Sequence, residues 1–198
     1  MLTRMSEAVE SRKQRVRAAV RARRRSLSDE ARAAARDGLT RRLIELCEER
    51  DPRSLTCYVA VPGEPDTSRF LTWAEERGVE LFLPATRPGG AMDWIRPSGV
   101  FAEGSLGIPE PVGPPAAPAE VAGADLMLIP ACAVDRRGVR LGWGGGYFDR
   151  FLERIHPRPP VYAVVFDDDL LPALPREPHD APVDGVVTPS VVRSFGTR

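Results

Sequence analysis

The sequence has 198 residues, of which 42% are hydrophobic, and its formal net charge is zero. This length and hydrophobic content are enough for one domain with a real core. Its apolar runs, such as 161–166, are far shorter than the roughly 20 residues of a membrane-spanning helix, and the charged N-terminus lacks the apolar core of a signal peptide. We therefore expect a single cytoplasmic domain over 1–198, with 1–10 as a candidate disordered tail.

The three cysteines, Cys47, Cys57 and Cys132, lie far apart in the sequence. An odd number of scattered cysteines gives neither a disulfide framework nor a Cys-x-x-Cys motif, which fits a reducing compartment. With only two histidines in addition, the usual nitrogen and sulfur ligands of a zinc site cannot be assembled. Any metal ion would therefore be held by carboxylates.

Residues 1–25 contain nine Lys or Arg and two Glu, a difference of +7, so they form a basic arm on an acidic remainder. The pattern predicts an amphipathic helix. Its expected buried face contains Val16, Ala19, Val20 and Arg23. Its opposite, basic face contains Lys13, Arg17, Arg21 and Arg24. Such an arm could bind nucleic acid, could bind a phosphorylated ligand, or could be a solvated helix face, and charge alone does not choose among them.

A break at 26–29 precedes a second predicted helix, with Ser28 as its N-cap and Leu39, Leu43 and Leu46 on its buried face. The next elements alternate between strand and helix. We expect strands at 55–61, 80–83, 125–129, 161–166 and 185–188, and helices at 67–77 and about 146–155. The predicted fold class is α/β: one domain with a largely parallel sheet flanked by helices and with an N-terminal basic helix.

The segment 107–123 contains five prolines and no periodicity. We expect it to be an extended surface connection rather than a domain boundary, because strands of the same kind are predicted on both sides of it.

The segment 125–149 reads as a buried strand, a polar loop, a glycine-rich turn and the start of a helix. Glycines before a helix favour anion binding, because backbone N–H groups can converge on a phosphate at the positive end of the helix. A dinucleotide fingerprint from Gly142 requires glycine at Tyr147, and a Walker loop requires Gly-Lys at Tyr147 and Phe148. Neither motif is present. The alternative to anion binding is a glycine-rich loop that serves only to make a tight turn.

The stretch Arg140-Leu-Gly-Trp-Gly-Gly-Gly-Tyr-Phe-Asp149 resembles the signature Arg-Leu-Gly-x-Gly-x-Gly-Tyr-Tyr-Asp of the 5-formyltetrahydrofolate cyclo-ligases. Further segments resemble blocks of this family in the same order: Lys13 to Arg17, Val59 to Thr67, Gly107 to Pro111, and His179 to Asp184 before Val-Val-Thr-Pro189. The resemblance spans nearly the whole chain.

The resemblance implies an ATP- and Mg²⁺-dependent cyclisation of 5-formyltetrahydrofolate to 5,10-methenyltetrahydrofolate, with release of ADP and phosphate. In it, the formyl oxygen on N5 is phosphorylated, N10 attacks the formyl carbon, and phosphate leaves. The implied partners are ATP and a reduced folate, with or without a polyglutamate extension. We expect a monomer that binds neither nucleic acid nor membrane.

The family's functional residues map onto this sequence in three groups. The residues implied to bind ATP are Lys13, Arg17, Arg140, Leu141, Gly142, Trp143, Gly144, Gly145, Gly146, Tyr147 and Phe148. Those implied to bind the folate are Val59, Glu64, Trp143, Gly145 and Tyr147. Asp149 and Asp184 align with the magnesium positions. From the residues alone, Asp149 could instead favour a helix start, Asp184 could be a turn residue, and Glu64 could be a solvated loop residue.

Two positions depart from the family signature. Trp143 stands where some members have a basic residue, which could exchange a charge for stacking. Phe148 replaces the second tyrosine, so any hydrogen bond made by that hydroxyl is absent here or supplied by water.

Two other functions remain open from the sequence. One is a sugar-phosphate or acyl-CoA enzyme on a similar α/β scaffold, because a fold does not fix the chemistry. The other is a non-enzymatic protein whose basic N-terminal helix binds nucleic acid.

Overall fold

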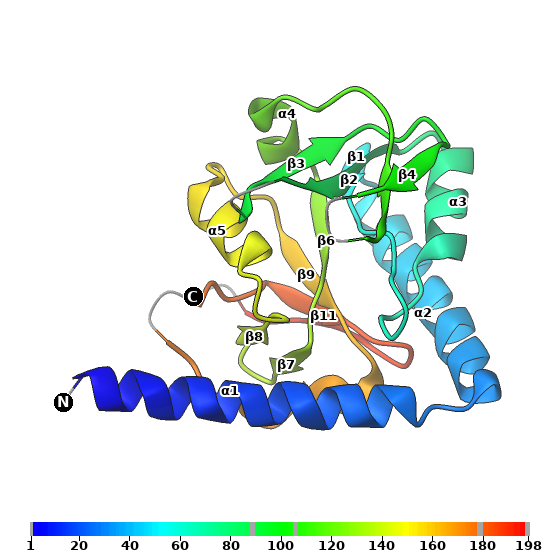
Figure 1. Ribbon diagram of the computed structural model, residues 1–198. Helices are drawn as coiled ribbons and strands as arrows, with labels where there is room; N and C mark the ends of the chain where they lie inside the picture. The colour runs from blue at the N-terminus through cyan, green and yellow to red at the C-terminus, as the bar shows by residue number, and fades with distance from the viewer. Residues whose placement is uncertain (1, 88–89, 105–106, 178–179, 197–198) are drawn as a thin grey trace.

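The computed structural model describes residues 2–87, 90–104, 107–177 and 180–196. A seven-stranded sheet forms its centre, in the order β12-β11-β9-β6-β1-β2-β3 (Figure 1). The strands are β1 Ser54–Thr56, β2 Glu80–Thr86, β3 Met92–Ile95, β6 Leu126–Pro130, β9 Val161–Val164, β11 Gly185–Val187 and β12 Val192–Ser194. The strands from β11 to β2 in this order are parallel, and the edge strands β12 and β3 are antiparallel to their neighbours. The predicted α/β class with a largely parallel sheet is confirmed.

Two smaller sheets were not predicted. One contains β7 Ala133–Asp135, β8 Arg140–Leu141 and β10 Leu170–Leu171, and the other contains β4 Phe101–Glu103 and β5 Pro109–Pro111. The expectation of a plain surface connection over 107–123 is therefore wrong. Strand β5 pairs with β4, and Glu110 is buried, where its carboxylate accepts hydrogen bonds from the backbone and hydroxyl of Thr86. The same segment also contains the short helix α4 Pro118–Ala122.

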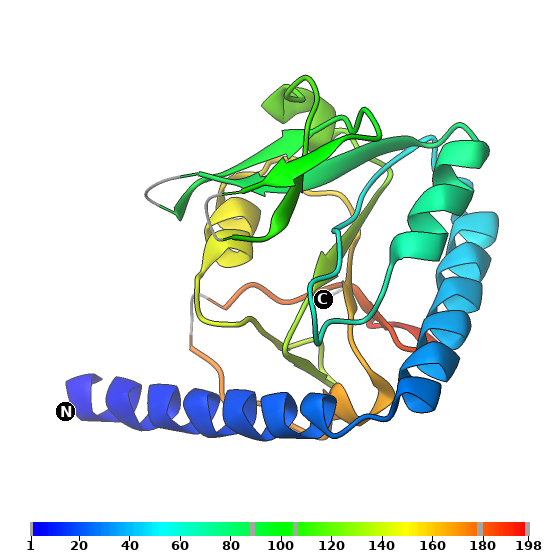
Figure 2. The same ribbon diagram turned by 45° about the vertical axis from the view of Figure 1, so that its right-hand side comes forward.

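Helices cover both faces of the central sheet (Figures 1 and 2). Helices α2 Asp29–Arg50 and α3 Ser68–Glu76 cover one face, and α4 and α5 Tyr147–Arg154 cover the other. Successive side chains of a strand point to opposite faces. Leu128 accordingly packs in one core with Leu43 of α2, and Ile129 packs in the other core with Leu152 of α5.

The second helix begins as predicted. The hydroxyl of Ser28 accepts a hydrogen bond from the backbone N–H of Ala31, which satisfies one of the free donors of the first turn. Leu39, Leu43 and Leu46 are fully buried, so both the cap and the buried face are confirmed.

Helix α1 Leu2–Arg25 lies along the edge of the sheet at which β6 ends, against the β7–β8 hairpin (Figure 1). Its first turns take up 2–10, the segment considered above as a candidate tail. The glutamate Glu10 accepts hydrogen bonds from Gln14 and Arg17, which ties this part of the helix to the next turns.

The packed face of α1 differs from the predicted one. Of the residues expected on it, Val20 is buried, but Ala19 is exposed. Instead Lys13, Arg17 and Arg24 of the basic face turn inward. Burying a charge is costly unless it is paired, and each of these cations has acceptors on other elements.

Candidate active site

A cavity of about 310 Å³ opens at the edge of the sheet where β1 and β6 end. In open α/β sheets this is the edge at which ligands bind. The cavity is lined by Tyr58, Val59, Val61, Glu64, Pro84, Thr86, Met92, Ile108, Pro109, Glu110, Pro130, Arg140, Gly142, Trp143, Gly145, Gly146, Tyr147, Phe148 and Asp149. Most of these walls are apolar, with a few ionisable groups among them, as is usual for a site that holds an organic ligand.

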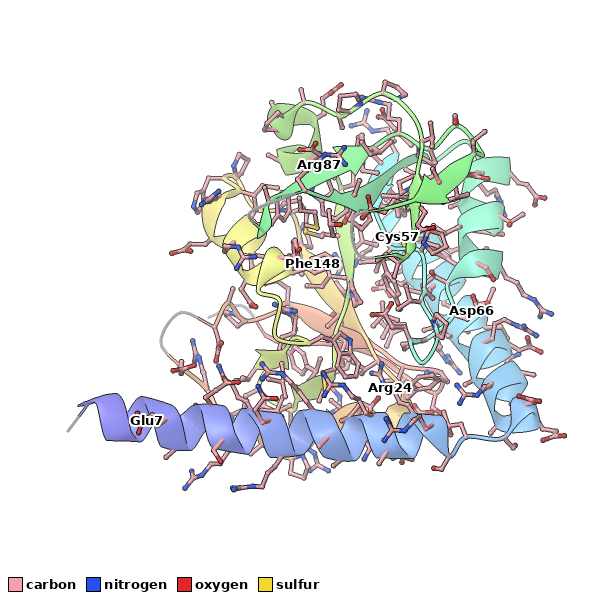
Figure 3. The ribbon with its side chains drawn as sticks, in the orientation of Figure 1. Glu7, Arg24, Cys57, Asp66, Arg87 and Phe148 are labelled. Carbon is pink, nitrogen blue, oxygen red and sulfur yellow. The ribbon has the colours of Figure 1, made fainter. Side chains whose placement is uncertain are left out.

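The glycine-rich turn between β8 and α5 forms one wall of this cavity. Gly144 and Gly146 have φ angles of 104° and 67°, in the region that favours glycine. Gly146 caps α5 in the left-handed conformation, so the chain enters the helix directly from the turn. Phe148, in the first turn of α5, lies in the middle of the molecule in Figure 3 and lines the cavity.

A second hollow of about 400 Å³, which we call the cleft, also adjoins this turn. It is lined by Glu10, Lys13, Gln14, Arg17, Arg140, Leu141, Gly142, Gly144, Gly146, Asp149, Arg150, Glu153, Glu177 and Asp180. The cavity and the cleft share Arg140, Gly142, Gly146 and Asp149. Two ligands, one in each hollow, would therefore meet at a common wall.

Lys13 and Arg17 reach the cleft from α1. The Lys13 Nζ lies 2.9 Å from a carboxylate oxygen of each of Glu177 and Asp180. Burial by itself would lower the pKa of Lys13, but the hydrogen bonds to Asp180 and Glu177 outweigh it and raise the pKa. The Arg17 Nε donates a 2.9 Å hydrogen bond to the carbonyl oxygen of Gly142, which ties the helix to the glycine turn.

Arg140 lies at the common wall and is 4% exposed. One of its terminal nitrogens donates to the carboxylate of Asp149, in the first turn of α5. Its Nε is buried and has no hydrogen-bond partner within the part of the chain that the structure describes. A buried donor without an acceptor costs about 1–3 kcal/mol, so this N–H is suited to an acceptor brought by a ligand or by water.

Glu64 projects into the cavity from the loop that follows β1. Burial raises the pKa of its carboxyl, although a backbone hydrogen bond from Val61, the charge of Arg24 and a hydrogen bond from Trp143 oppose the rise. A hydrogen bond holds this loop in place, because the Tyr58 hydroxyl donates to the carbonyl oxygen of Pro65 at 2.9 Å. The carboxyl group is therefore held in a largely apolar surrounding.

The predicted site residues come together with one exception. Among the described residues, every residue predicted to bind ATP or folate, together with Asp149, lines the cavity, the cleft or both. Asp184 lies elsewhere. Its carboxylate accepts hydrogen bonds from Arg158 at 2.9 Å and from the N–H of Val161 at 2.8 Å, where β9 begins. That is the opposite edge of the parallel sheet, so the structure does not bring Asp184 to the cleft with Asp149.

A different aspartate, Asp180, lies at the cleft. It lines the cleft together with Asp149 and binds Lys13. Both aspartates belong to the same short block of sequence, and spacing alone could not tell which of them faces the site. His179, in the same block, lies outside the described residues.

Other lining residues were not among the predicted site residues. Ile108, Pro109 and Glu110 of the proline-rich segment form one side of the cavity, and Met92 of the unpredicted strand β3 lies beside them. The sequence block 107–111 was the available signal for this side.

The fold and the two hollows together define an α/β protein with an apolar cavity and a charged cleft that share one wall, a site suited to an enzyme. The family model described as "5-formyltetrahydrofolate cyclo-ligase family" matches residues 9–189. The chain belongs to this family, and it is an enzyme of folate one-carbon metabolism.

Similar proteins agree with this membership. The 5-formyltetrahydrofolate cyclo-ligase of Mycolicibacterium smegmatis is 41% identical over 145 residues, which cover 69% of this chain and 74% of the relative. The Escherichia coli K12 cyclo-ligase is 28% identical over 178 residues, which cover 87% of this chain and 98% of the relative. The solved structure of Aquifex aeolicus 5,10-methenyltetrahydrofolate synthetase has a TM-score of 0.76 and 30% identity, and the match covers 94% of each chain.

Within the described ranges, no helix is long and apolar enough to cross a membrane. Across the same residues, no three His, Cys, Asp or Glu side chains are grouped so that they alone could hold a metal ion.

Proposed function

We propose that this enzyme uses ATP to close 5-formyltetrahydrofolate to 5,10-methenyltetrahydrofolate, releasing ADP and phosphate. The observation that carries the proposal is the wall shared by the apolar cavity and the charged cleft, to which Lys13, Arg17 and Arg140 contribute. An enzyme that transfers a phosphoryl group from ATP to an organic substrate needs such an arrangement, because the two reactants must meet away from water. The name of the Aquifex aeolicus relative supports the same product.

The reduced folate would bind with its pterin in the cavity. Val59, Tyr147 and Phe148 offer apolar and aromatic surface for the flat ring. Glu64 offers a carboxyl group for hydrogen bonding to the polar edge of the pterin. This orientation places the N5 formyl group toward the glycine turn.

The triphosphate would bind in the cleft, where Arg17 and Arg140 lie beside the glycine turn and Lys13 lies between Glu177 and Asp180. Backbone N–H groups of the turn and the amino-terminal end of α5 add attraction for negative charge.

The reaction has two steps. In the first, the formyl oxygen attacks the terminal phosphorus of ATP, the bond between that phosphorus and the bridging oxygen breaks, and ADP leaves. In the second, N10 attacks the formyl carbon and loses its proton, the carbon–oxygen bond breaks, and phosphate leaves with the methenyl product. Because N5 and N10 belong to one molecule, effective molarities on the order of 10⁵ M are available when the substrate is held bent.

Arg140 has the central role in this scheme. It lies at the wall where the formyl oxygen and the phosphoryl group would meet, and its buried Nε needs an acceptor. The oxygens of the transferred phosphoryl group, over which negative charge spreads, would be such acceptors.

The donor set fits a magnesium ion bound together with nucleotide. Mg²⁺ commonly takes one or two carboxylates and completes its octahedron with phosphate oxygens and water. Asp149 and Asp180, both at the cleft, would provide the carboxylates. When bound, the ion would offset negative charge on the phosphates.

The nucleic-acid-binding function fits less well. Such an arm would need its basic face in solvent, but Lys13, Arg17 and Arg24 of that face are buried against the body of the protein, although Arg21 is exposed. Because one chain builds both hollows, we also propose that the enzyme acts as a monomer.

One assay tests the proposal directly. The protein is incubated with 5-formyltetrahydrofolate, ATP and Mg²⁺ while the absorbance of methenyltetrahydrofolate is followed. Product is expected only when all three are present. Product formed without nucleotide, or no product with all three, would contradict the proposal.

A further inference from the structure

Arg24, near the carboxy-terminal end of α1, is almost fully buried although its side chain is always charged. Figure 3 shows it on the side of α1 that faces the sheet. It is not among the described residues that line the cavity or the cleft. Any effect of Arg24 on ligands in these two hollows must therefore pass through its neighbours.

The guanidinium of Arg24 joins three segments at the carboxyl edge of the sheet. Its Nε donates to the carboxylate of Asp169 at 2.8 Å, and its terminal nitrogens donate to the carbonyl oxygens of Gly63 at 3.1 Å, Ala131 at 3.0 Å and Cys132 at 3.1 Å. These acceptors follow β9, β1 and β6, which are neighbours in the sheet. Arg24 therefore fixes three adjacent loops relative to one another.

The bond to Gly63 reaches the turn 61–64, which carries Glu64 into the cavity. The turn closes on itself, because the N–H of Glu64 donates to the carbonyl oxygen of Val61 at 2.9 Å and the N–H of Val61 donates to the Glu64 carboxylate at 3.3 Å. Such a turn can move as a unit unless another element holds it. The hydrogen bond from Arg24 ties it to α1.

A second route from Arg24 to Glu64 passes through Trp143. The guanidinium carbon of Arg24 lies 5.0 Å from the centroid of the Trp143 ring, within the range of a cation–π contact. Trp143 in turn donates a hydrogen bond to the Glu64 carboxylate, and the charge of Arg24 opposes the rise in the pKa of that carboxyl. Two independent contacts thus direct the same side chain.

We propose that Arg24 is a positioning residue for the folate site, which fixes the Glu64 carboxyl group in the cavity by holding the 61–64 turn and the Trp143 ring. This inference rests on the proposed function, which places the pterin beside Glu64. A single planar guanidinium can hold acceptors on three segments in one fixed arrangement, which the single nitrogen of lysine cannot do.

The neighbouring residue Arg23 supplies a matched control. It also donates to the carboxylate of Asp169, but it makes no printed contact with the 61–64 turn or Trp143 among the described residues. Arg24→Met and Arg23→Met each remove one arginine from Asp169 and leave the other in place. Arg24→Lys is a second test variant, because it keeps a charge beside Asp169 and so avoids an unpaired buried carboxylate.

The experiment measures initial rates of methenyl formation at varied folate and at varied ATP, with folding checked by circular dichroism. Arg24→Met should raise the KM for folate by about tenfold or more, which is the effect of losing one hydrogen bond to a charged group, and should leave the KM for ATP within about twofold. Arg24→Lys should raise the folate KM by about threefold or more. Arg23→Met should leave both constants within about twofold.

A double-mutant cycle tests the route through Glu64. In a Glu64→Ala background the positioned group is absent, so adding Arg24→Met should raise the folate KM by less than about twofold further. A residue that only stabilises the fold would not produce this coupling, because it acts on the folded fraction and not on one ligand.

An unchanged folate KM in folded Arg24→Met, or in Arg24→Lys where the methionine variant does not fold, would overturn the inference. So would equal rises in the KM for folate and for ATP, an equal effect of Arg23→Met, or additive effects in the cycle. A wild-type protein that forms no methenyl product would overturn the proposed function itself, whereas these outcomes are measured in a protein that forms it.

Discussion

Replacing Arg140 by methionine should separate stability from activity. The side chain is almost fully buried, its Nε lacks a partner in the described part of the chain, and it lies at a cleft that also contains the cations of Lys13 and Arg17. Removing the unpaired donor returns about 1–3 kcal/mol, which offsets the lost pair with the partly exposed Asp149. We therefore expect the free energy of unfolding to change by less than about 1 kcal/mol.

Activity, unlike stability, should fall strongly in the Arg140→Met variant. A hydrogen bond between a charged donor and phosphate contributes about 1.5–3 kcal/mol, so kcat/KM for ATP should fall about 10- to 150-fold. Arg140→Lys should be intermediate, since it keeps the charge but loses the planar arrangement of donors.

The measurements are denaturant unfolding for stability and initial rates of methenyl formation at varied ATP. A loss of more than about 2 kcal/mol of stability together with an unchanged kcat/KM would refute the reasoning, because it would make Arg140 a structural residue. An unchanged rate in a stable Arg140→Met variant would refute it as well.

Three further predictions concern the same site. Asp149→Asn and Asp180→Asn should each raise the Mg²⁺ concentration that gives the half-maximal rate by about tenfold or more, whereas the control Asp184→Asn should not. A magnesium titration of the rate measures this, and an equal effect of Asp184→Asn would contradict the prediction. Lys13→Ala should raise the KM for ATP by about tenfold and leave that for folate nearly unchanged, and similar shifts of both constants in initial-rate measurements would reject a phosphate contact. Glu64 has a raised pKa in the folded protein, so its stabilising contribution is complete below pH 4.5, its ordinary value, and is lost as the pH rises through the folded pKa. Glu64→Gln should therefore raise the melting temperature at neutral pH, and this increase should disappear in acid. The same variant should weaken folate binding. An increase in melting temperature that does not depend on pH would contradict the prediction.

Local signals predicted a large part of the fold. The cap at Ser28 depends on residues within one helical turn, so the sequence contains the whole cause. The central strands could be predicted because a strand buried on both faces is a continuous apolar run. The first strand extended less far than predicted, since the ladder ends at Thr56 and the following residues turn to line the cavity.

The edges of the sheets could not be predicted in this way. Strands β3, β4 and β5 contain Pro, Asp and Glu residues, which have low strand propensity, and they are strands because a partner supplies their hydrogen bonds. The side of the cavity formed by Ile108 and Glu110 was missed for the same reason.

The sequence by itself determined the fold class and the composition of the glycine turn, and of the site residues that its resemblance to the cyclo-ligases named, all but Asp184 line the cavity or the cleft. Only the tertiary structure decided which charges are buried. The basic face of α1 packs inward because Asp180 and Asp169 arrive from 167 and 145 positions away to pair with Lys13 and Arg24. That Asp180 lies at the cleft and Asp184 does not has the same origin. Burying a charge is favourable only where partners converge on it, and convergence of distant segments is not encoded in the spacing of any one segment.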